Sequence, residues 1–328
     1  MATQLDLPEQ FRQRIIAAGG REWARWLDTL PELVATLADQ WGLSIGETFP
    51  LAFNYVVAVE REDAGELVLK IGPPVEPGGE GTAREASALR LAGPAAVEVI
   101  EEDVDACALL LERATPGTPL SAIWDEDDDA ATETLGSAML GFWQTVDSTC
   151  GLPPLSDLEH TFEEFDRGRY GSAASPKDLV GQLADITSGL RDLRAAAGTA
   201  RRVFEELLAD RAPSVLLHGD LHHDNVLSDE GRGWVVIDPK GFFGDRAYDT
   251  GAMLYNPEAG FGAVADPDPL LRRRMAVMSQ VLGIDRERLA AWGYVKAVLS
   301  VLWTLEDGGG LDAGDSRMGA IAALRLMI

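Results

Sequence analysis

The stretch HGDLHHDNVLSDEGRGWVVIDPKG, residues 218–241, holds residue types that suit three kinds of chemistry. Clustered histidines could bind a metal ion, histidine–aspartate pairs could serve a hydrolase triad, and aspartates spaced around an asparagine could serve phosphoryl transfer. A zinc site is disfavoured because His218, His222 and His223 lie between strand ends and no cysteine is near. A serine hydrolase is disfavoured because no G-x-S-x-G motif occurs within this stretch.

Phosphoryl transfer matches this stretch residue by residue. The segment 218–225 has the spacing H-x-D-L-x-x-x-N, in which Asp220 would accept the proton of the attacking hydroxyl and Asn225 would hold a magnesium ion. Asp238 follows the apolar run WVVI and opens the turn DPKG, where the second magnesium ligand is expected. HGD alone indicates little, but the loop, the strand and DPKG in this order predict half of a phosphotransferase site.

The other half, which holds the nucleotide, is expected upstream. Lys70 ends the run LVLK and Glu85 lies on the helix that follows. Such a lysine contacts the α- and β-phosphates and is itself held by the glutamate. The chain has four lysines (Lys70, Lys177, Lys240 and Lys296), so a lysine at this point favours a functional role.

Two further parts of a nucleotide site are expected in the first third of the chain. The run ALLLER into ATPGTPL resembles a hinge between two lobes, and its backbone would receive adenine at Glu112, Arg113, Ala114 and Thr115. The segment GETFPLAFNYVV has no glycine-rich turn, so a shorter loop at residues 51–55 is expected to cover the triphosphate with backbone amides.

Composition narrows the class of protein. With 328 residues, 46% hydrophobic and 25% charged, the chain can form one bilobal unit or two domains. Two scattered cysteines favour a reducing, cytoplasmic location, and no signal-like start or membrane-spanning run is present, so no membrane partner is expected. The net charge of -26 argues against nucleic acid and would attract cations, although acidity can also serve solubility alone.

The elements that would position these residues change type along the chain. Residues 8–41 have helical spacing, and Trp23, Trp26 and Trp41 are expected to pack that helix on the first sheet. The expected elements after it are a strand hairpin at 53–62 and 65–72, a helix at 81–93, two strands within 97–113, helices at 132–146, 175–193 and 199–211, short buried strands at 214–221 and 233–239, and mostly helix to 328. The acidic run 124–132 is interpreted as a helix entry, because it lacks the ligand spacing of a calcium loop.

These pieces together resemble a known family. FNYVVAVE, LVLKIG, REASALRLA, LLLERATPGTPL, LLHGDLHHDNVL, VVIDPKGFFGDRAYDTGAML and VLWTLEDG are similar to the aminoglycoside phosphotransferase superfamily, and most closely to aminoglycoside/hydroxyurea antibiotic resistance kinases of the streptomycin 6-phosphotransferase type. The resemblance implies an α+β, protein-kinase-like bilobal fold. Its N-lobe, residues 1–112, would hold an antiparallel sheet with one key helix, residues 113–117 would be the hinge, and residues 118–328 would form a mostly helical C-lobe.

The resemblance also implies a reaction. It is ATP- and Mg²⁺-dependent O-phosphorylation of a small hydroxylated molecule, with Asp220 as base and Asn225 and Asp238 as Mg²⁺ ligands. We expect a cationic acceptor, such as streptomycin, bound by Glu306 and Asp307 at the WTLEDG helix end.

Other residues near the motifs have open roles. Asp245 and Asp249 could bind substrate or brace the catalytic loop, and bracing is favoured. Trp303 is a further candidate for the acceptor side. His222 and His223 are expected to pack or donate hydrogen bonds and not to bind a metal.

Several functions remain alternatives. The acceptor could be another aminoglycoside, hydroxyurea, an aminosugar or an amino alcohol. A protein substrate is disfavoured because Gly219 stands in place of the arginine that reads activation-loop phosphate, and Thr250 is the one aliphatic hydroxyl between Asp238 and Asn256. A nucleotide-binding pseudoenzyme acting as an interaction module is also open.

Overall fold

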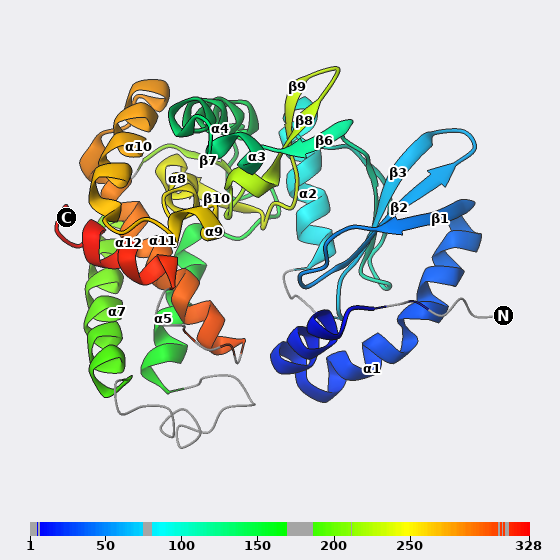
Figure 1. The fold of residues 1–328 in the computed structure, drawn as a ribbon, viewed down its shortest axis with the longest axis horizontal. Coiled ribbons are helices and arrows are strands. Elements are labelled where there is room, and N and C mark those ends of the chain that lie inside the picture. The colour runs from blue at the N-terminus through cyan, green and yellow to red at the C-terminus, as the bar shows by residue number, and fades with distance from the viewer. Residues whose placement is uncertain are drawn as a thin grey trace.

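Two clusters of buried apolar side chains organise the computed structural model of the protein, one mostly in each half of the chain. The structure describes residues 5, 7–74, 81–168, 186–210, 212–307, 309, 311 and 315–328. Figure 1 shows a lobe built on a twisted sheet beside a larger, mostly helical lobe. The predicted α+β arrangement, a sheet lobe followed by a helical lobe, is therefore confirmed.

The N-terminal lobe is an antiparallel sheet with the strand order β1-β2-β3-β5-β4. Its strands are β1 (Leu43–Thr48), β2 (Tyr55–Arg61), β3 (Gly65–Ile71), β4 (Val99–Asp103) and β5 (Ala108–Glu112). Helix α2 (Thr82–Ala92) lies between β3 and β4 in sequence and packs against the rest of the molecule with Ala86 and Leu89. Lys70 on β3 and Glu85 on α2 therefore come from facing elements.

Helix α1 (Glu9–Trp41) covers the sheet, as Figure 1 shows below β1 to β3. It kinks at Gly20, whose φ of 58° lies outside the helical region. Trp26 is buried in the cluster formed with the sheet, and Trp23 and Trp41 pack against that cluster. The packing role predicted for these tryptophans is confirmed, and Trp23 also donates from Nε1 to Pro74 O at 3.1 Å.

Two small sheets beyond the first lobe hold the chemistry-bearing segment. Strand β7 (Ser214–Leu217) pairs with β10 (Phe242–Asp245), and β8 (Val226–Asp229) lies between β6 (Pro116–Pro119) and β9 (Gly233–Val236). The segments 218–225 and 237–241 leave these strands at one place, since Ile237 N donates to Asn225 O at 3.0 Å and Lys240 N donates to His218 O at 2.7 Å.

Helices make up the rest of the C-terminal lobe. They are α3 (Ser121–Trp124), α4 (Asp128–Phe142), α5 (Glu159–Asp166), α7 (Ile186–Ala209), α8 (Thr250–Met253), α9 (Glu258–Phe261), α10 (Pro267–Leu282), α11 (Arg286–Glu306) and α12 (Ser316–Leu324), with 3₁₀ turns at Gly93–Ala95, Leu155–Leu158, His223–Asn225 and Arg246–Asp249. Helix α11 is buried on most sides and packs against α7, α8 and α12. Among the described residues, no helix is both long and apolar enough to cross a membrane.

The structure differs from the sequence expectation in several elements. Besides β1, the sequence analysis did not predict strands β6, β8 and β10 or helices α3 and α5. Strand β1 was not predicted, because LSIGET is polar and exposed along most of its length at the edge of the sheet. The helix predicted at 199–211 is not separate: α7 runs without a break from Ile186 to Ala209 and includes the end of the helix predicted at 175–193. The start of that helix, Ser175–Pro176, lies outside the described residues.

The acidic run before α4 behaves as a helix entry, as predicted. Asp127 is the N-cap and accepts a hydrogen bond from Ala130 N at 3.0 Å. Asp128 pairs with the buried Arg274 at 2.7 Å, which ties the start of α4 to α10.

Candidate active site

The catalytic loop, residues 218–225, is held by Asp249 of the turn after β10. The carboxylate accepts hydrogen bonds from His218 N at 2.9 Å and Gly219 N at 2.8 Å, and Trp143 Nε1 donates to it at 2.9 Å. Burial raises the pKa of Asp249 to about 6, although these donors oppose the shift. Gly219 has a φ of 87°, and a Cβ there would lie 2.8 Å from the Phe242 ring, so the turn requires glycine.

His218 ties the same loop to the strand that leads into DPKG. Its Nε2 lies 2.8 Å from Ile237 O, and Asp220 N donates to its Nδ1 at 3.2 Å. Burial lowers the pKa of His218 to about 4, so at neutral pH the ring is uncharged and Nε2–H donates to Ile237 O. The histidine of HGD is therefore a structural link between the loop and Asp238.

Asp220 faces the space between the lobes with 33% of its side chain exposed. Lys296 Nζ lies 3.3 Å from its Oδ1. Burial alone would raise the pKa of Asp220, but Lys296, with His222 and Lys240, outweighs burial and holds the pKa below its ordinary value. The carboxylate is ionised at neutral pH and can accept a proton, as a general base must.

Asn225 and the residue before Asp238 are hydrogen-bonded, since Ile237 N donates to Asn225 O at 3.0 Å. Asn225 Nδ2 donates to Asp220 O at 2.9 Å, which makes its amide oxygen the atom that can contact a cation. Asp238 has a positive φ of 56°, and its two oxygens contact Lys70 Nζ at 2.5 Å and Lys240 Nζ at 3.1 Å. An amide oxygen and a carboxylate fit Mg²⁺, which is usually bound by a few protein oxygens together with phosphates and water.

Lys70 is buried between two carboxylates. Its Nζ lies 2.7 Å from Glu85 Oε2 and 2.5 Å from Asp238 Oδ1. Burial would lower the pKa of Lys70, but the two carboxylates outweigh it and hold the pKa above its ordinary value. The pKa of Glu85 is raised because burial exceeds the effect of the lysine. The lysine and glutamate predicted from sequence are therefore brought together with Asp238.

The hinge candidates lie where the chain passes from β5 to β6. Glu112 N donates to Glu98 O at 2.9 Å, its side chain pairs with Arg232 at 2.7 Å, and Thr115 O accepts from Glu230 N at 2.8 Å. Arg113 pairs with Glu66 at 3.3 Å, and Ala114 is buried between the lobes. Adenine binding at Glu112, Arg113, Ala114 and Thr115 stays a prediction, as do the lobe boundaries at 112/113 and 117/118.

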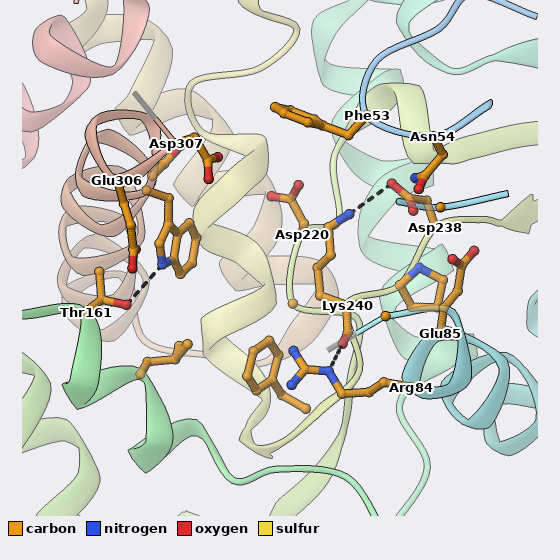
Figure 2. Close-up of a pocket in the computed structure, with 18 of the residues that line it drawn as sticks. Phe53, Asn54, Arg84, Glu85, Thr161, Asp220, Asp238, Lys240, Glu306 and Asp307 are labelled. Atoms are coloured by element: carbon orange, nitrogen blue, oxygen red, sulfur yellow. Dashed lines mark hydrogen bonds and ion pairs between the residues drawn. The ribbon is translucent and has the colours of Figure 1, made fainter. Parts of the chain in front are cut away.

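A cleft of about 660 Å³ opens between the lobes beside Asp220. Figure 2 shows Asp220 between two groups of side chains, with Glu306 and Asp307 on one side and Asp238 on the other. The residues that line this cleft on the helical side are Asp157, Leu158, His160, Thr161, Lys296, Ser300, Trp303, Glu306 and Asp307. Trp303 donates from Nε1 to Thr161 Oγ1 at 3.0 Å, so α11 and α5 form one wall.

The predicted acceptor residues lie in different places. Trp303, Glu306 and Asp307 line the cleft, whereas Asp245 and Asp249 are buried outside it. Asp245 pairs with Arg288 at 2.7 Å and accepts a hydrogen bond from Trp292 Nε1. The substrate-binding alternative is therefore disfavoured for both residues. Asp249 braces the loop, whereas Asp245 contacts α11 through Arg288 and Trp292.

The loop between β1 and β2 covers the same cleft. Phe53 and Asn54 line it, and Figure 2 shows Phe53 above Asp220 and Asn54 beside Asp238. A second cavity, of about 1220 Å³, meets the first at Phe53, Asp220 and Ser300. Asp220 therefore lines both cavities. His222, which lines the second cavity, accepts from Asp224 N through Nδ1, and His223 is buried.

The model of the aminoglycoside/hydroxyurea antibiotic resistance kinases matches residues 46–308, which include the sheet, the catalytic loop and α11. The chain belongs to this family. The streptomycin 6-kinase of Streptomyces glaucescens is 31% identical over 306 residues, 93% of this chain and 92% of that protein. The hydroxyurea phosphotransferase of Kitasatospora aureofaciens is 32% identical over 93% of this chain and 82% of its own length.

The fold of this resistance-kinase family member is also found among solved structures. A choline/ethanolamine kinase family protein from Mesorhizobium loti superposes with a TM-score of 0.60 at 18% identity, covering 91% of this chain and 94% of that one. The predicted family and the protein-kinase-like bilobal fold are confirmed. Like the family to which it belongs, this kinase is a phosphotransferase that acts on small molecules.

Sequence reasoning missed several residues of the kinase's cleft. Arg84 donates from Nε to Lys240 O at 2.6 Å and lies over the Phe242 ring at 4.4 Å, so α2 also holds the DPKG turn. Asn54 and Thr161 carry no sequence signal of their own. Lys240 and Lys296 did carry a sequence signal, because the chain has four lysines in all.

Proposed function

We propose that the protein transfers the γ-phosphate of ATP to a hydroxyl of a cationic, hydroxyl-rich small molecule, an aminoglycoside such as streptomycin. The observation that carries the proposal is the position of Asp220, between the Lys70–Asp238 group and the wall formed by Glu306 and Asp307. A phosphate donor on one side and a cationic alcohol on the other would meet at this carboxylate.

The reaction assigns one task to each group. The acceptor oxygen attacks the γ-phosphorus, the bond from phosphorus to the β,γ-bridging oxygen breaks, and ADP leaves with those electrons. The hydroxyl proton passes to the Asp220 carboxylate, which faces the cleft and is ionised at neutral pH. Lys70 now pairs with Asp238, and its ammonium would contact the phosphates when nucleotide binds.

Asn225 and Asp238 would hold Mg²⁺ in this reaction. When bound, the ion supplies positive charge that neutralises the phosphates. The present contacts of Asp238 support this role, because the carboxylate already lies against two ammonium groups, those of Lys70 and Lys240. A carboxylate in that setting stays ionised, and its pKa lies below the ordinary value because the lysines outweigh burial.

The acidic wall is the reason for a cationic acceptor. Glu306 and Asp307 are adjacent at the end of α11, and Asp157 lines the same cleft. Guanidinium and ammonium groups form charge-assisted hydrogen bonds with carboxylates. The similarity to proteins named streptomycin 6-kinase supports an aminoglycoside. Hydroxyurea, which carries no such cations, is the alternative that the similarity to a hydroxyurea phosphotransferase suggests.

The test measures ADP release and the phosphorylated product with streptomycin, kanamycin, hydroxyurea and choline as acceptors. We expect streptomycin or kanamycin to stimulate turnover in a Mg²⁺-dependent way. Asp220→Asn should lower kcat by about 10² to 10⁴ while the affinity for ATP stays nearly constant, because the base does not bind nucleotide. Asp238→Ala should weaken binding of Mg²⁺–ATP itself. Normal transfer by Asp220→Asn, or turnover only with uncharged acceptors, would overturn the proposal.

A further inference from the structure

Lys296 is a buried cation that touches the loop carrying Asp220. It lies on α11, and only 2% of its side chain is exposed. Its Nζ donates to Gly219 O at 2.6 Å and lies 3.3 Å from Asp220 Oδ1. The rings of Tyr248 and Trp303 flank the ammonium, with centroids 5.4 and 4.6 Å from Nζ.

An ammonium in this position needs its carboxylate. Taking a charge out of water is costly unless it is paired and hydrogen-bonded, and Asp220 Oδ1 is the carboxylate oxygen at ion-pair distance from Lys296 in the part of the chain that the structure describes. The two aromatic faces add attraction for a cation. The energetic cost of moving Asp220 away from Nζ therefore restrains the carboxylate.

The contacts of Lys296 complement those of Asp249. Asp249 accepts from the N–H groups of His218 and Gly219, whereas Lys296 donates to the carbonyl of Gly219 and faces the next side chain. The Gly219 peptide groups are thus held through both their donor and their acceptor atoms. Asp249 fixes the backbone of the loop, whereas Lys296 contacts both that backbone and the Asp220 carboxylate.

Helix α11 carries this cation and the acceptor wall on one face. Lys296, Ser300, Trp303 and Asp307 line the cleft at spacings of four, three and four residues, which place them along one side of a helix. Eleven residues at 1.5 Å each span roughly 16 Å. One continuous helix therefore sets the distance between the base and the wall that would hold the acceptor.

We propose that Lys296 is a positioning residue for Asp220, and that α11 aligns the acceptor with the base through Lys296 at one end and Trp303 to Asp307 at the other. The inference rests on the proposed function, since it assigns the base to Asp220. In this arrangement Lys296 holds the carboxylate where the acceptor hydroxyl arrives and makes no contact with nucleotide. Loss of its charge affects the transfer step and leaves both binding steps intact.

The experiment compares kcat, the KM for ATP and the KM for streptomycin in Lys296→Met, Lys296→Gln and Lys296→Arg, with slow hydrolysis of ATP as a second readout in which water is the acceptor. Lys296→Gln keeps a donor for Gly219 O without the charge, and Lys296→Arg keeps a cation. Arg288→Met is the matched control: it removes a cation from the same helix that pairs with the buried Asp245 and does not line the cleft.

We expect Lys296→Met and Lys296→Gln to lose about tenfold or more in kcat for both acceptors, with each KM within about twofold of wild type. Lys296→Arg should recover part of that loss. Arg288→Met should lower the Tm and leave the kcat of the folded enzyme unchanged. This separation of kcat from KM is not expected of a residue that only stabilises the fold.

Four results would overturn the inference: normal kcat in both neutral variants, an equal loss of kcat in Arg288→Met, a loss confined to the KM for ATP, or failure of both neutral variants to fold, which would make Lys296 a stability residue. Asp220→Asn separates this outcome from failure of the proposed function. If Asp220→Asn abolishes transfer while Lys296→Met does not, only the role of Lys296 is wrong. If Asp220→Asn transfers phosphate normally, the proposed function is wrong.

Discussion

Lys70 and Glu85 form a buried ion pair, with Nζ 2.7 Å from Oε2, that joins β3 to α2. The same ammonium lies 2.5 Å from Asp238, so one lysine is shared by the helix of the first lobe and the turn of the second. Glu85 therefore shares the Lys70 ammonium with the carboxylate that would hold Mg²⁺.

Glu85→Gln is expected to raise the KM for ATP about tenfold and leave the KM for the acceptor unchanged. Without the glutamate charge, Lys70 pairs more strongly with Asp238, and both groups become less available to Mg²⁺–ATP. Steady-state kinetics with each substrate varied in turn measure the effect. Glu60→Gln, at an exposed glutamate of β2, is the control, and an unchanged KM for ATP in Glu85→Gln would contradict the prediction.

Asp249→Asn is expected to destabilise the protein and slow turnover. The two carboxylate oxygens of Asp249 accept from three N–H groups, whereas an asparagine side chain has one acceptor oxygen. A buried N–H therefore loses its partner in the variant, at a cost of about 1–3 kcal/mol. Urea unfolding at pH 7 and kcat well below the Tm measure the two effects. Asp128→Asn, which weakens the pair with Arg274 and leaves the acceptor of His218 N and Gly219 N in place, should lose stability and retain kcat. Equal kcat losses in both variants would remove the bracing role of Asp249.

Asp307 should make acceptor binding depend on pH near 6. It faces the cleft, and removal from water, together with the neighbouring Glu306 carboxylate, raises its pKa to about 6. Below that pH the group is neutral and attracts a cation less, so kcat/KM for streptomycin should rise as pH increases through 6. A profile of kcat/KM from pH 5 to 8 measures the change.

Asp307→Asn should remove this step and keep the low value at all pH. Glu306→Gln should raise the KM for the acceptor and move the step to lower pH, because it removes the neighbouring charge that helps to raise the pKa of Asp307. The KM for ATP is the internal control and should not change in either variant. A step that persists unchanged in Asp307→Asn would assign the titration to another group.

The local spacing of the motifs was enough to predict which of the candidate side chains lie together. Asp220 and Asn225 lie five residues apart on one short loop, and Asp238 follows the hairpin of β8 and β9. Their proximity is therefore set by hydrogen bonds over a short length of chain. The strand lysine and helix glutamate were also recognisable, because Lys70 and Glu85 stand on consecutive elements and form an ion pair that such a site requires.

Only the tertiary structure decided which distant segments of the chain contact one another. Lys296 lies 76 residues beyond Asp220 in the printed numbering, and only the packing of α11 under the catalytic loop brings its Nζ to Oδ1. Arg84 reaches Lys240, and Asp245 turns away from the cleft to Arg288, through the same kind of long-range packing. Short-range spacing determines which groups share a turn. Burial of the two apolar clusters determines which helices face the cleft. The residue types at single positions do not encode which helices face it.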